Sequence, residues 1–341
     1  MNRTGNTTRY KPCRALLAAI LLLSGCTETL VRGTDESGEA GEIIAFRTPA
    51  PSRAVEETFV AGDVFSVWGY YTPTDAASTV FDATSVSTPD GSRWSYHGAR
   101  YWKADKTYDF YALYPAADRL GAAVSADFDA AGRLSVARFD AGQGADLMAA
   151  VAQDFAGSDA RQVPLTFKHL LARIEVVAKR SATTEGIVDF NPVVHSAKLH
   201  GMYRTGSLSM AADDLTDGEA LLAAWSIPSD AGESPTDANT PFSQFAGPVA
   251  ATVDGVPLME VLLFPQRLSG EYRLDLIYST DTGGAETKSA SIQLTSLPLT
   301  VWEAGKRYRY TFTLSEDDRI LFEPPTVNAW SDAVGGITIV E

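Results

Sequence analysis

Alternation of apolar and polar residues with a period of two runs through most of the chain and limits its fold more than any other feature. In the segment RYRYTFTL, the rings of Tyr308, Tyr310 and Phe312 alternate with arginine and threonine. This spacing puts rings on one face of a strand and polar groups on the other. Further predicted strands are 64–71, 108–114, 172–178, 197–203, 261–264, 272–276 and 291–294. Turn dipeptides such as Asp90-Gly91 and Asp254-Gly255 separate them. The pattern predicts an all-β fold of antiparallel β-sandwiches. A single helix is expected, at 216–225.

One phrase occurs twice. The chain reads WKADKTYDF at 102–110 and WEAGKRYRY at 302–310, with tryptophan, lysine, tyrosine and a second aromatic residue at the same spacings. In both copies a polar turn follows the tryptophan and leads into a strand with alternating rings. We therefore expect Trp102 and Trp302 to be buried at equivalent corners of two sandwich domains in tandem, over residues 43–160 and 161–341.

Length and composition are those of a folded protein without a nucleic-acid partner. The 341 residues are 45% hydrophobic and 21% charged, which supplies enough apolar material for one large or two medium domains. The formal net charge is −15, and no lysine or arginine run with interleaved aromatics occurs. The electrostatic signature of nucleic-acid binding is missing.

The N-terminus has the three parts of a lipoprotein export signal. Basic residues precede an apolar run at 15–23 that is too short to span a bilayer, and Leu23-Ser24-Gly25-Cys26 closes it like a bacterial lipobox. We expect residues 1–25 to be removed, Cys26 to carry lipid in the outer membrane, and residues 26–42 to be a flexible tether. The alternative is a chance cysteine beside a hydrophobic run. Because Cys13 lies in the leader, the mature chain would keep no thiol for a disulfide, a metal or catalysis.

Motifs of enzyme chemistry are missing. The sequence holds no G-x-S-x-G, H-E-x-x-H, G-x-G-x-x-G, Walker or C-x-x-C motif, so no catalytic residue, cofactor or metal site is expected. His169 lies between Phe167 and Leu170, where a hydrogen-bonded core histidine is more common than a ligand. The acidic doublets at 213–214 and 317–318 are read as solvated turns, because neither has the alternating ligands of a calcium loop.

Aromatic residues in the first third leave one alternative function open. Such rings can stack on sugars or pack in a core, and their strand periodicity favours packing. The residues concerned are Tyr70, Tyr71, Trp94, Tyr96, Tyr101 and Trp102. A monomeric surface lipoprotein that binds a glycan is therefore the second hypothesis.

Several segments, in this order, resemble the fimbrillin family over nearly the whole mature chain. They are the lipobox, IIAF at 43–46 followed by SRA at 52–54, LTFKHLLARIEV at 165–176, FPQ at 264–266, the phrase at 302–314, and VNAW with GGITI at 327–339. The resemblance implies two transthyretin-like antiparallel β-sandwich domains and a role as stalk, anchor or tip subunit of a type V fimbria. The implied partners are other fimbrial subunits, bound by β-strand addition, and a host or bacterial surface ligand.

The resemblance also implies processing. An arginine-specific protease would remove the first strand, expected at 42–46, and a strand of the next subunit would fill the groove. Arg32, Arg47 and Arg53 are the candidate cuts. Arg53 is favoured, because Pro49 and Pro51 predict an extended, exposed loop before it. The expected donor strand is the C-terminal segment with Ile337, Ile339 and Val340; the alternative is that this segment is the last strand of its own sandwich.

Overall fold

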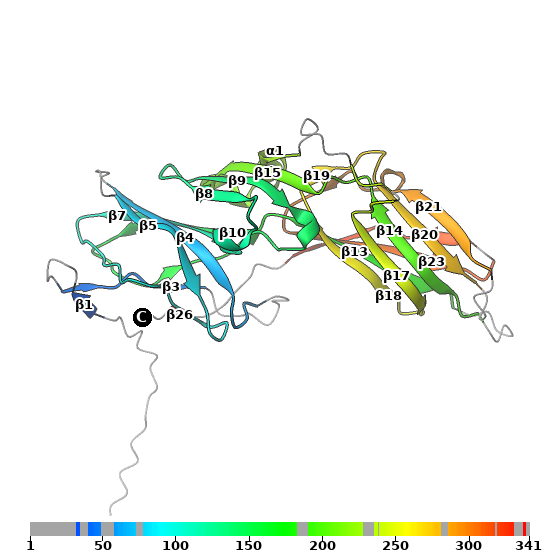
Figure 1. The fold of residues 1–341 in the computed structure, drawn as a ribbon, viewed down its shortest axis with the longest axis horizontal. Coiled ribbons are helices and arrows are strands. Elements are labelled where there is room, and N and C mark those ends of the chain that lie inside the picture. The colour runs from blue at the N-terminus through cyan, green and yellow to red at the C-terminus, as the bar shows by residue number, and fades with distance from the viewer. Residues whose placement is uncertain are drawn as a thin grey trace, which may run out of the picture.

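The chain folds into a long body of β-sheets in two halves, side by side along the long axis of Figure 1. The structure, a computed structural model, describes residues 32–34, 40–48, 58–72, 78–182, 190–227, 235–237, 239–280, 286–317, 319–330 and 337–338. The helical elements are η1 (Ala117–Arg119), η2 (Ala141–Gln143), η3 (Ala212–Thr216), α1 (Gly218–Ala224) and η4 (Leu294–Ser296). The predicted all-β class is confirmed, as is a helix within 216–225.

Two sheets form the N-terminal half. The central sheet contains, in spatial order, β12 (Lys168–His169), β10 (Met148–Ala156), β7 (Thr107–Tyr114), β4 (Val64–Thr72) and β5 (Thr79–Ser87). The small sheet contains β11 (Val163–Pro164), β3 (Phe46–Arg47), β26 (Ile337–Thr338) and β6 (Arg93–Trp94). Their facing side chains form one core cluster, to which the small sheet contributes Phe46, Trp94 and Val163.

A third sheet, the junction sheet, joins the halves. Its strands are β16 (Trp225–Ser226), β15 (Thr205–Ala211), β9 (Arg133–Asp140) and β8 (Ser125–Phe128). It covers the other face of the central sheet, where Phe128 packs on Trp68 and Tyr111 at centroid distances of 5.7 and 5.1 Å. The central sheet is therefore buried on both faces, which explains why β4 is buried almost without interruption.

Two sheets form the C-terminal half. One is mixed and contains β18 (Val256–Leu263), β13 (Ala172–Arg180), β23 (Lys306–Leu314), β24 (Ile320–Phe322) and β25 (Thr326–Ala329). The other contains β17 (Ser243–Ala250), β14 (Val193–His200), β20 (Arg273–Ser279) and β21 (Lys288–Gln293). Two pairs stand apart: β19 (Gln266–Arg267) with β22 (Val301–Trp302), and β1 (Arg32–Thr34) with β2 (Ala40–Glu42).

Among the described strands most pairs are antiparallel, as predicted, but three are parallel. β13 and β23 are parallel over eight register pairs, from Arg173↔Arg307 to Arg180↔Leu314. The other parallel pairs are β11 with β3 and β26 with β6. Alternation within a strand is the same for both directions, so it could not distinguish them.

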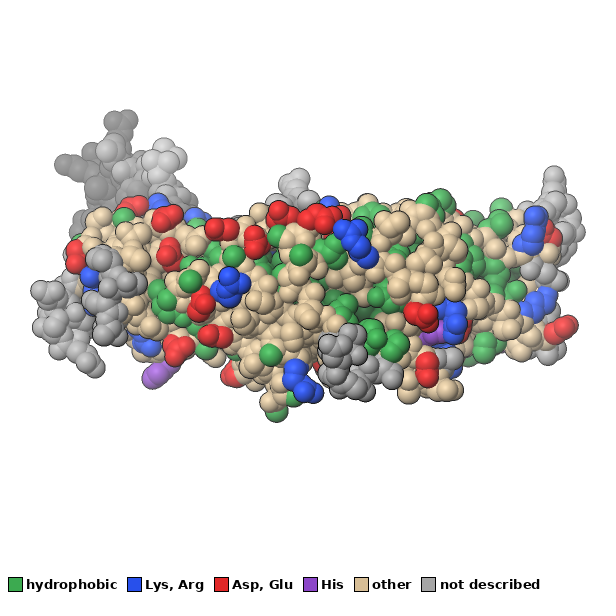
Figure 2. Space-filling model, turned by 90° about the horizontal axis from the view of Figure 1, so that it is seen from above, with side chains coloured by type: hydrophobic (Ala, Val, Ile, Leu, Met, Phe, Trp, Pro, Cys, Tyr) green, Lys and Arg blue, Asp and Glu red, His purple; other side chains and the backbone are tan. Residues whose placement is uncertain are grey.

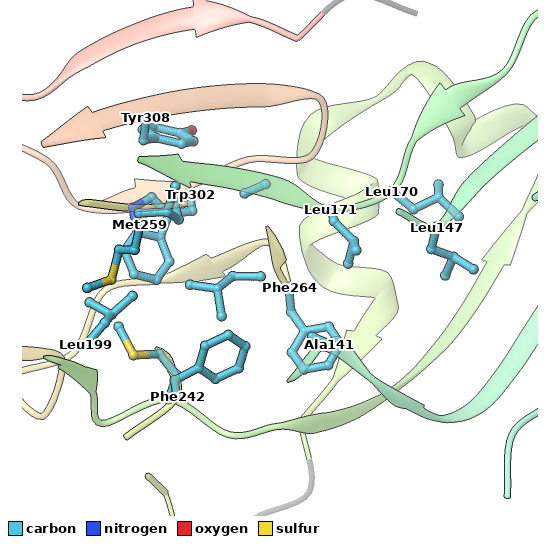
Figure 3. Close-up of a cluster of buried hydrophobic side chains, with 14 of the residues drawn as sticks. Ala141, Leu147, Leu170, Leu171, Leu199, Phe242, Met259, Phe264, Trp302 and Tyr308 are labelled. Atoms are coloured by element: carbon cyan, nitrogen blue, oxygen red, sulfur yellow. The ribbon is translucent and has the colours of Figure 1, made fainter. Parts of the chain in front are cut away.

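The core of the C-terminal half is continuous with the junction. Figure 3 shows Trp302, Met259, Leu199 and Phe242 at one end of this cluster, and Leu170 beside Leu147 at the other. The cluster also includes Trp68 and Tyr111 of the central sheet. Apolar contact therefore runs without a gap from one half to the other.

The chain does not divide between halves at one point. β11 and β12 follow residue 160 but pair with β3 and β10 of the N-terminal half, while β9 precedes it and pairs with β15. The tandem boundary after residue 160 stays a prediction. The tether predicted over 26–42 also stays a prediction; within it, the described residues form β1 and β2, which pair as an antiparallel hairpin with Arg32 opposite Glu42.

The repeated phrase has one local structure in both copies. Trp102 and Trp302 are buried, as predicted, with 7% and 0% of their surface exposed. The backbone N–H after each tryptophan donates to the tyrosine hydroxyl of the phrase: Lys103 N to Tyr108 at 2.7 Å and Glu303 N to Tyr308 at 2.8 Å. The tyrosine thus closes the turn and begins the strand.

Candidate functional site: the seat of the first strand

The segment from Glu42 to Thr48 lies in the small sheet and bonds to the chain on both of its edges. On one edge, Ile44 N donates to Arg100 O at 2.8 Å and Trp102 N donates to Glu42 O at 2.9 Å. On the other edge, Val163 N donates to Ala45 O at 2.8 Å and Leu165 N to Arg47 O at 2.7 Å. The segment is therefore an inner strand, although it is the first part of the sandwich in sequence.

Two side chains of this segment fill the core below it. Ile44 and Phe46 have no exposed surface. The ring of Phe46 meets Phe81 and Phe110 edge-on, at centroid distances of 5.2 and 5.6 Å. Removing the segment would open a hydrophobic groove lined by these rings, because nothing else in the cluster takes the place of Phe46.

A buried tyrosine fixes the backbone at the same place. The hydroxyl of Tyr96 donates to the carbonyl oxygen of Ile44 at 2.6 Å. Burial raises the pKa of Tyr96 well above its ordinary value, so the phenol stays a neutral donor. Without the segment, this donor would face an empty groove.

The turn before β6 positions the tryptophan of β6 against the end of the segment from Glu42 to Thr48. The Asp90 carboxylate accepts hydrogen bonds from the backbone N–H groups of Ser92 and Arg93, which holds the pKa of Asp90 below its usual range. Gly91 has φ +78°, and a Cβ there would lie 2.1 Å from the carbonyl oxygen of Phe59, so the turn requires glycine. It presents Trp94, whose Nε1 donates to Thr48 Oγ1 at 3.2 Å.

The structure places two of the three candidate cut sites. Arg47 is exposed on β3, with its carbonyl oxygen in the ladder bond to Leu165 N. Arg32 lies in the β1–β2 hairpin, before the buried residues of the segment. Arg53, like the lipidation candidate Cys26, lies outside the described residues.

The C-terminal strand lies in the same small sheet. β26 pairs antiparallel with β3 at Ile337↔Arg47 and parallel with β6 at Ile337↔Arg93 and Thr338↔Trp94. Figure 1 shows it beside β3, away from β23. Ile337 therefore pairs in a sheet of its own chain, whereas Ile339 and Val340 lie outside the described residues; the donor role and the alternative of a last strand of its own sandwich both stay predictions.

Two strands of the small sheet, β6 and β11, were not recognised as functional from the sequence. β6 and β11 are two-residue strands, too short to show alternation. Their one signal was the tryptophan of β6, which was considered for sugar stacking or core packing and not as part of a strand-binding site.

The proposed sugar-stacking rings mostly belong to the core. Tyr71, Trp94, Tyr96 and Trp102 are buried, as their strand periodicity favoured, and Tyr70 and Tyr101 are half-buried. Tyr70 donates its hydroxyl hydrogen to Phe128 O at 2.7 Å. These residues do not form an exposed aromatic platform.

The histidines have ordinary partners. His169 is buried, bonds through Nδ1 to Asp146 Oδ2 at 2.8 Å and stacks on Trp330 at 3.7 Å. His200 Nε2 contacts Asp275 Oδ2 at 2.6 Å, and His195 Nε2 contacts Ser279 Oγ at 3.0 Å. Among the described residues, no group of histidine, cysteine and acidic side chains could hold a metal.

One face of the described surface carries charged side chains of both signs. Figure 2 shows basic side chains scattered singly among acidic ones over one face. Within the described ranges, no helix has the length and apolar character to cross a bilayer.

A surface hollow of about 540 Å³ lies over β14, β20 and β21, where Asp275 already accepts a hydrogen bond from Ser291 at 2.6 Å.

Comparisons with known proteins agree with this architecture. A family model described as fimbrillin-like matches residues 52–330. A fimbrial protein from Bacteroides vulgatus has a similar fold, with TM-score 0.59 and 16% identity over 85% of this chain and 99% of that one. A proposed cell adhesion protein from Bacteroides ovatus aligns with TM-score 0.50 and 16% identity over 86% of this chain and 99% of that one. No curated protein sequence matches. The match to the family model covers most of the chain, which therefore belongs to the fimbrillin-like family.

Proposed function

We propose that the protein is a structural subunit of a cell-surface fimbria, exported as an outer-membrane lipoprotein and assembled by strand exchange at the small sheet. Membership of the fimbrillin-like family supports the fimbrial role. The observation that supports the exchange step is the position of the segment from Glu42 to Thr48 in the small sheet. This segment, at the start of the folded body, is an inner strand of the small sheet, so its loss leaves a groove that another strand can fill.

Two free-energy terms, the burial of apolar side chains and the pairing of backbone groups, favour a replacement strand in that groove. Burial of Ile44 and Phe46 contributes roughly 1.5–3 kcal/mol each. Loss of the segment would also leave the N–H groups of Trp102, Val163 and Leu165 without their carbonyl partners. Buried, unpaired backbone groups cost about 1–3 kcal/mol each. An extended strand with alternating apolar residues satisfies both demands.

The position of each arginine decides which cut would open the groove. A cut after Arg32 leaves Ile44 and Phe46 attached. A cut after Arg47 requires a protease to engage a carbonyl that accepts a hydrogen bond at 2.7 Å from Leu165 N. Arg53 lies beyond the segment, so a cut there would remove all of it, and we retain it as the processing site.

The donor in this scheme is the C-terminal segment of a second copy. Its strand β26 already adopts the pairing geometry of the small sheet within its own chain. Ile337, Ile339 and Val340 would supply apolar side chains to the groove. The same strand added between subunits would link one to the next.

The test of assembly compares four purified chains treated with an arginine-specific protease: the parent, Arg53→Ala, Arg47→Ala, and a chain truncated after Gly336. The parent should form a ladder of oligomers on an unboiled gel. Arg53→Ala should keep its first strand and stay monomeric, and Arg47→Ala is the matched control that should assemble. If Arg53→Ala assembles like the parent, the chosen cut is wrong; if the truncated chain does, the donor is wrong.

Lipidation is tested separately in cells. Cys26→Ala should abolish incorporation of a fatty-acid probe, whereas Cys13→Ala, in the leader, should not. One acyl chain anchors only weakly, and a second makes the anchoring stable. Continued labelling of Cys26→Ala would overturn the lipoprotein assignment.

A further inference from the structure

The hollow over the C-terminal half is a second candidate site, separate from the small sheet. It has a volume of about 540 Å³ and is lined by residues of β14, β20 and β21. Figure 1 shows these three strands at the opposite end of the body from β3 and β26. The volume is within the range of about 300–1,000 Å³ that is typical of small-molecule sites. Because β21 is the last described strand of its sheet, a larger ligand can extend from the hollow past the sheet edge.

The strand register arranges the polar lining in rows on the outer face of this sheet. Register partners share a face, and Leu274 and Leu276 of β20 point the other way, into the core. The two rows across β14, β20 and β21 are Lys198–Asp275–Ser291 and Ser196–Ile277–Ser289. Half of these side chains are serines, whose short side chains leave space above the sheet.

The lining carries two basic side chains and one carboxylate. Ser291 donates to Asp275 Oδ1 at 2.6 Å, and His200 Nε2 lies 2.6 Å from Asp275 Oδ2. Burial raises the pKa of Asp275, but the hydrogen bonds from Ser291 and His200 outweigh it and hold the pKa below its ordinary value. The carboxylate is therefore ionised at neutral pH and neutralises one of the two cations, Lys198 and Arg273. The hollow is positively charged on a chain whose formal net charge is −15.

Arg273 can bind an anion and keep its contact with Asp275. Its contacts with Asp275 Oδ1, at 3.3 Å, and with His200 Nε2, at 3.2 Å, both use Nε. Its side chain is 43% exposed, and its two terminal nitrogens have no hydrogen-bond acceptor among the described residues. A guanidinium binds a carboxylate through two parallel N–H···O bonds. The remaining donors of Arg273 therefore suit a carboxylate.

The rest of the lining suits hydroxyl groups and a small apolar surface. Ser196 and Ser289 have no side-chain hydrogen-bond partner in the described part of the chain, and a serine hydroxyl can donate one hydrogen bond and accept two. Ile277 lies between them in the same row and is 42% exposed, which is unusual for a large apolar side chain in this structure. A sugar ring has hydroxyl groups around its edge and C–H groups on its face, so it matches this combination.

We propose that this hollow binds an acidic saccharide, with Arg273 on the carboxylate, Ser196 and Ser289 on the hydroxyl groups, and Ile277 against the C–H face of the ring. Lys198 adds a second positive charge beside the carboxylate. The net positive charge of the lining selects an acidic sugar over a neutral one. This proposal does not rest on strand exchange, because all of these residues belong to the C-terminal half.

The test uses residues 26–341 with Cys26→Ala and titrates sugars under saturation-transfer NMR. The acidic probes are the methyl glycosides of glucuronic acid, galacturonic acid and N-acetylneuraminic acid. The matched neutral probes are the methyl glycosides of glucose and galactose. At least one acidic probe should bind about tenfold more tightly than the neutral probes, since hydrogen bonds to a charged group contribute about this factor. If no acidic probe binds more tightly than the neutral ones, the proposal is overturned.

Two variants alter the hollow in different ways. Arg273→Gln removes the guanidinium and should weaken binding of the acidic probe about tenfold, with little effect on the neutral ones. Ser289→Phe, at an exposed strand position that tolerates an aromatic ring, fills the hollow and should abolish binding of the acidic probe. The matched control is Arg309→Gln, on the outer face of the other sheet, where Nε donates to Glu175 Oε2 at 2.8 Å. It should bind like the parent.

Unchanged affinity in Arg273→Gln or in Ser289→Phe, at the thermal midpoint of the parent, overturns the assignment of the site. Sodium sulfate separates a saccharide site from a simple anion site: if sulfate binds the parent as tightly as the acidic probe, the saccharide assignment is wrong. Polymer formation is scored separately. A chain that polymerises but binds none of the acidic probes contradicts this proposal and leaves the proposed function in place.

Discussion

At the scale of single residues, the two tryptophans of the repeated phrase are expected to dominate local stability. Trp302 is fully buried and its Nε1 donates to the Tyr310 hydroxyl at 2.9 Å, while Trp102 packs edge-on against Tyr108 at 4.8 Å. Trp102→Ala and Trp302→Ala should each lower the free energy of unfolding by about 3–5 kcal/mol. Urea denaturation followed by circular dichroism measures this. Val253→Ala, at an exposed site, is the control. A midpoint equal to that of the parent would contradict the equivalence of the two corners.

A second prediction at this scale concerns alkaline pH. Burial raises the pKa of Tyr308 from 10.0 to about 12. Between these values the folded chain keeps a proton that the unfolded chain has lost, so this contribution is complete below pH 10 and disappears as the pH rises towards 12. Tyr308→Phe leaves Glu303 N–H without its partner and should cost about 1–3 kcal/mol at pH 8. The stability gap between the two chains should narrow from pH 10 to 12; a constant gap would rule out this linkage.

At the scale of elements, the seat of the first strand depends on a glycine in β4. A Cβ at Gly69 would lie 2.8 Å from Phe81 Cδ2 and 3.1 Å from Phe110 Cδ1, the rings that receive Phe46. Gly69→Ala should therefore destabilise the chain by about 1–3 kcal/mol, because the rings must shift in a close-packed core. Gly218→Ala, in α1 with open space around it, is the matched control and should be neutral or stabilising. Equal thermal midpoints for the two variants would show that the rings adapt without cost.

At the scale of the whole molecule, the junction sheet predicts that the two halves unfold together. β8 and β9 come from the N-terminal part of the sequence but pair through β9 with β15, and one apolar cluster includes both Trp68 and Trp302. Calorimetry of the full chain should give a single transition. A fragment of residues 43–160 lacks β11, β12 and β15, so it should not fold alone. Two resolved transitions, one shared with the fragment, would instead support independent domains.

The sequence by itself determined several of the strands and which of their faces are buried, although β5, β9, β10, β15 and β17 were not predicted. Alternation predicted β4, β7, β13 and β23 to within two residues, because a period of two follows directly from strand geometry. The repeated phrase correctly indicated two buried tryptophans, since each copy carries its own turn and the tyrosine that closes it. All of these features depend on residues that are close in sequence.

Only the tertiary structure decided which strands are neighbours. Alternation states which side chains face inward but not which strand lies alongside, so it could not predict the parallel pairing of β13 with β23 or the pairing of β9 with β15. For the same reason, the sequence left open where the C-terminal strand lies. Its position between β3 and β6 depends on backbone groups contributed by residues 47, 93 and 94, far from it in the chain. Pairing between distant segments is set by the packing of the whole core, which no local pattern records.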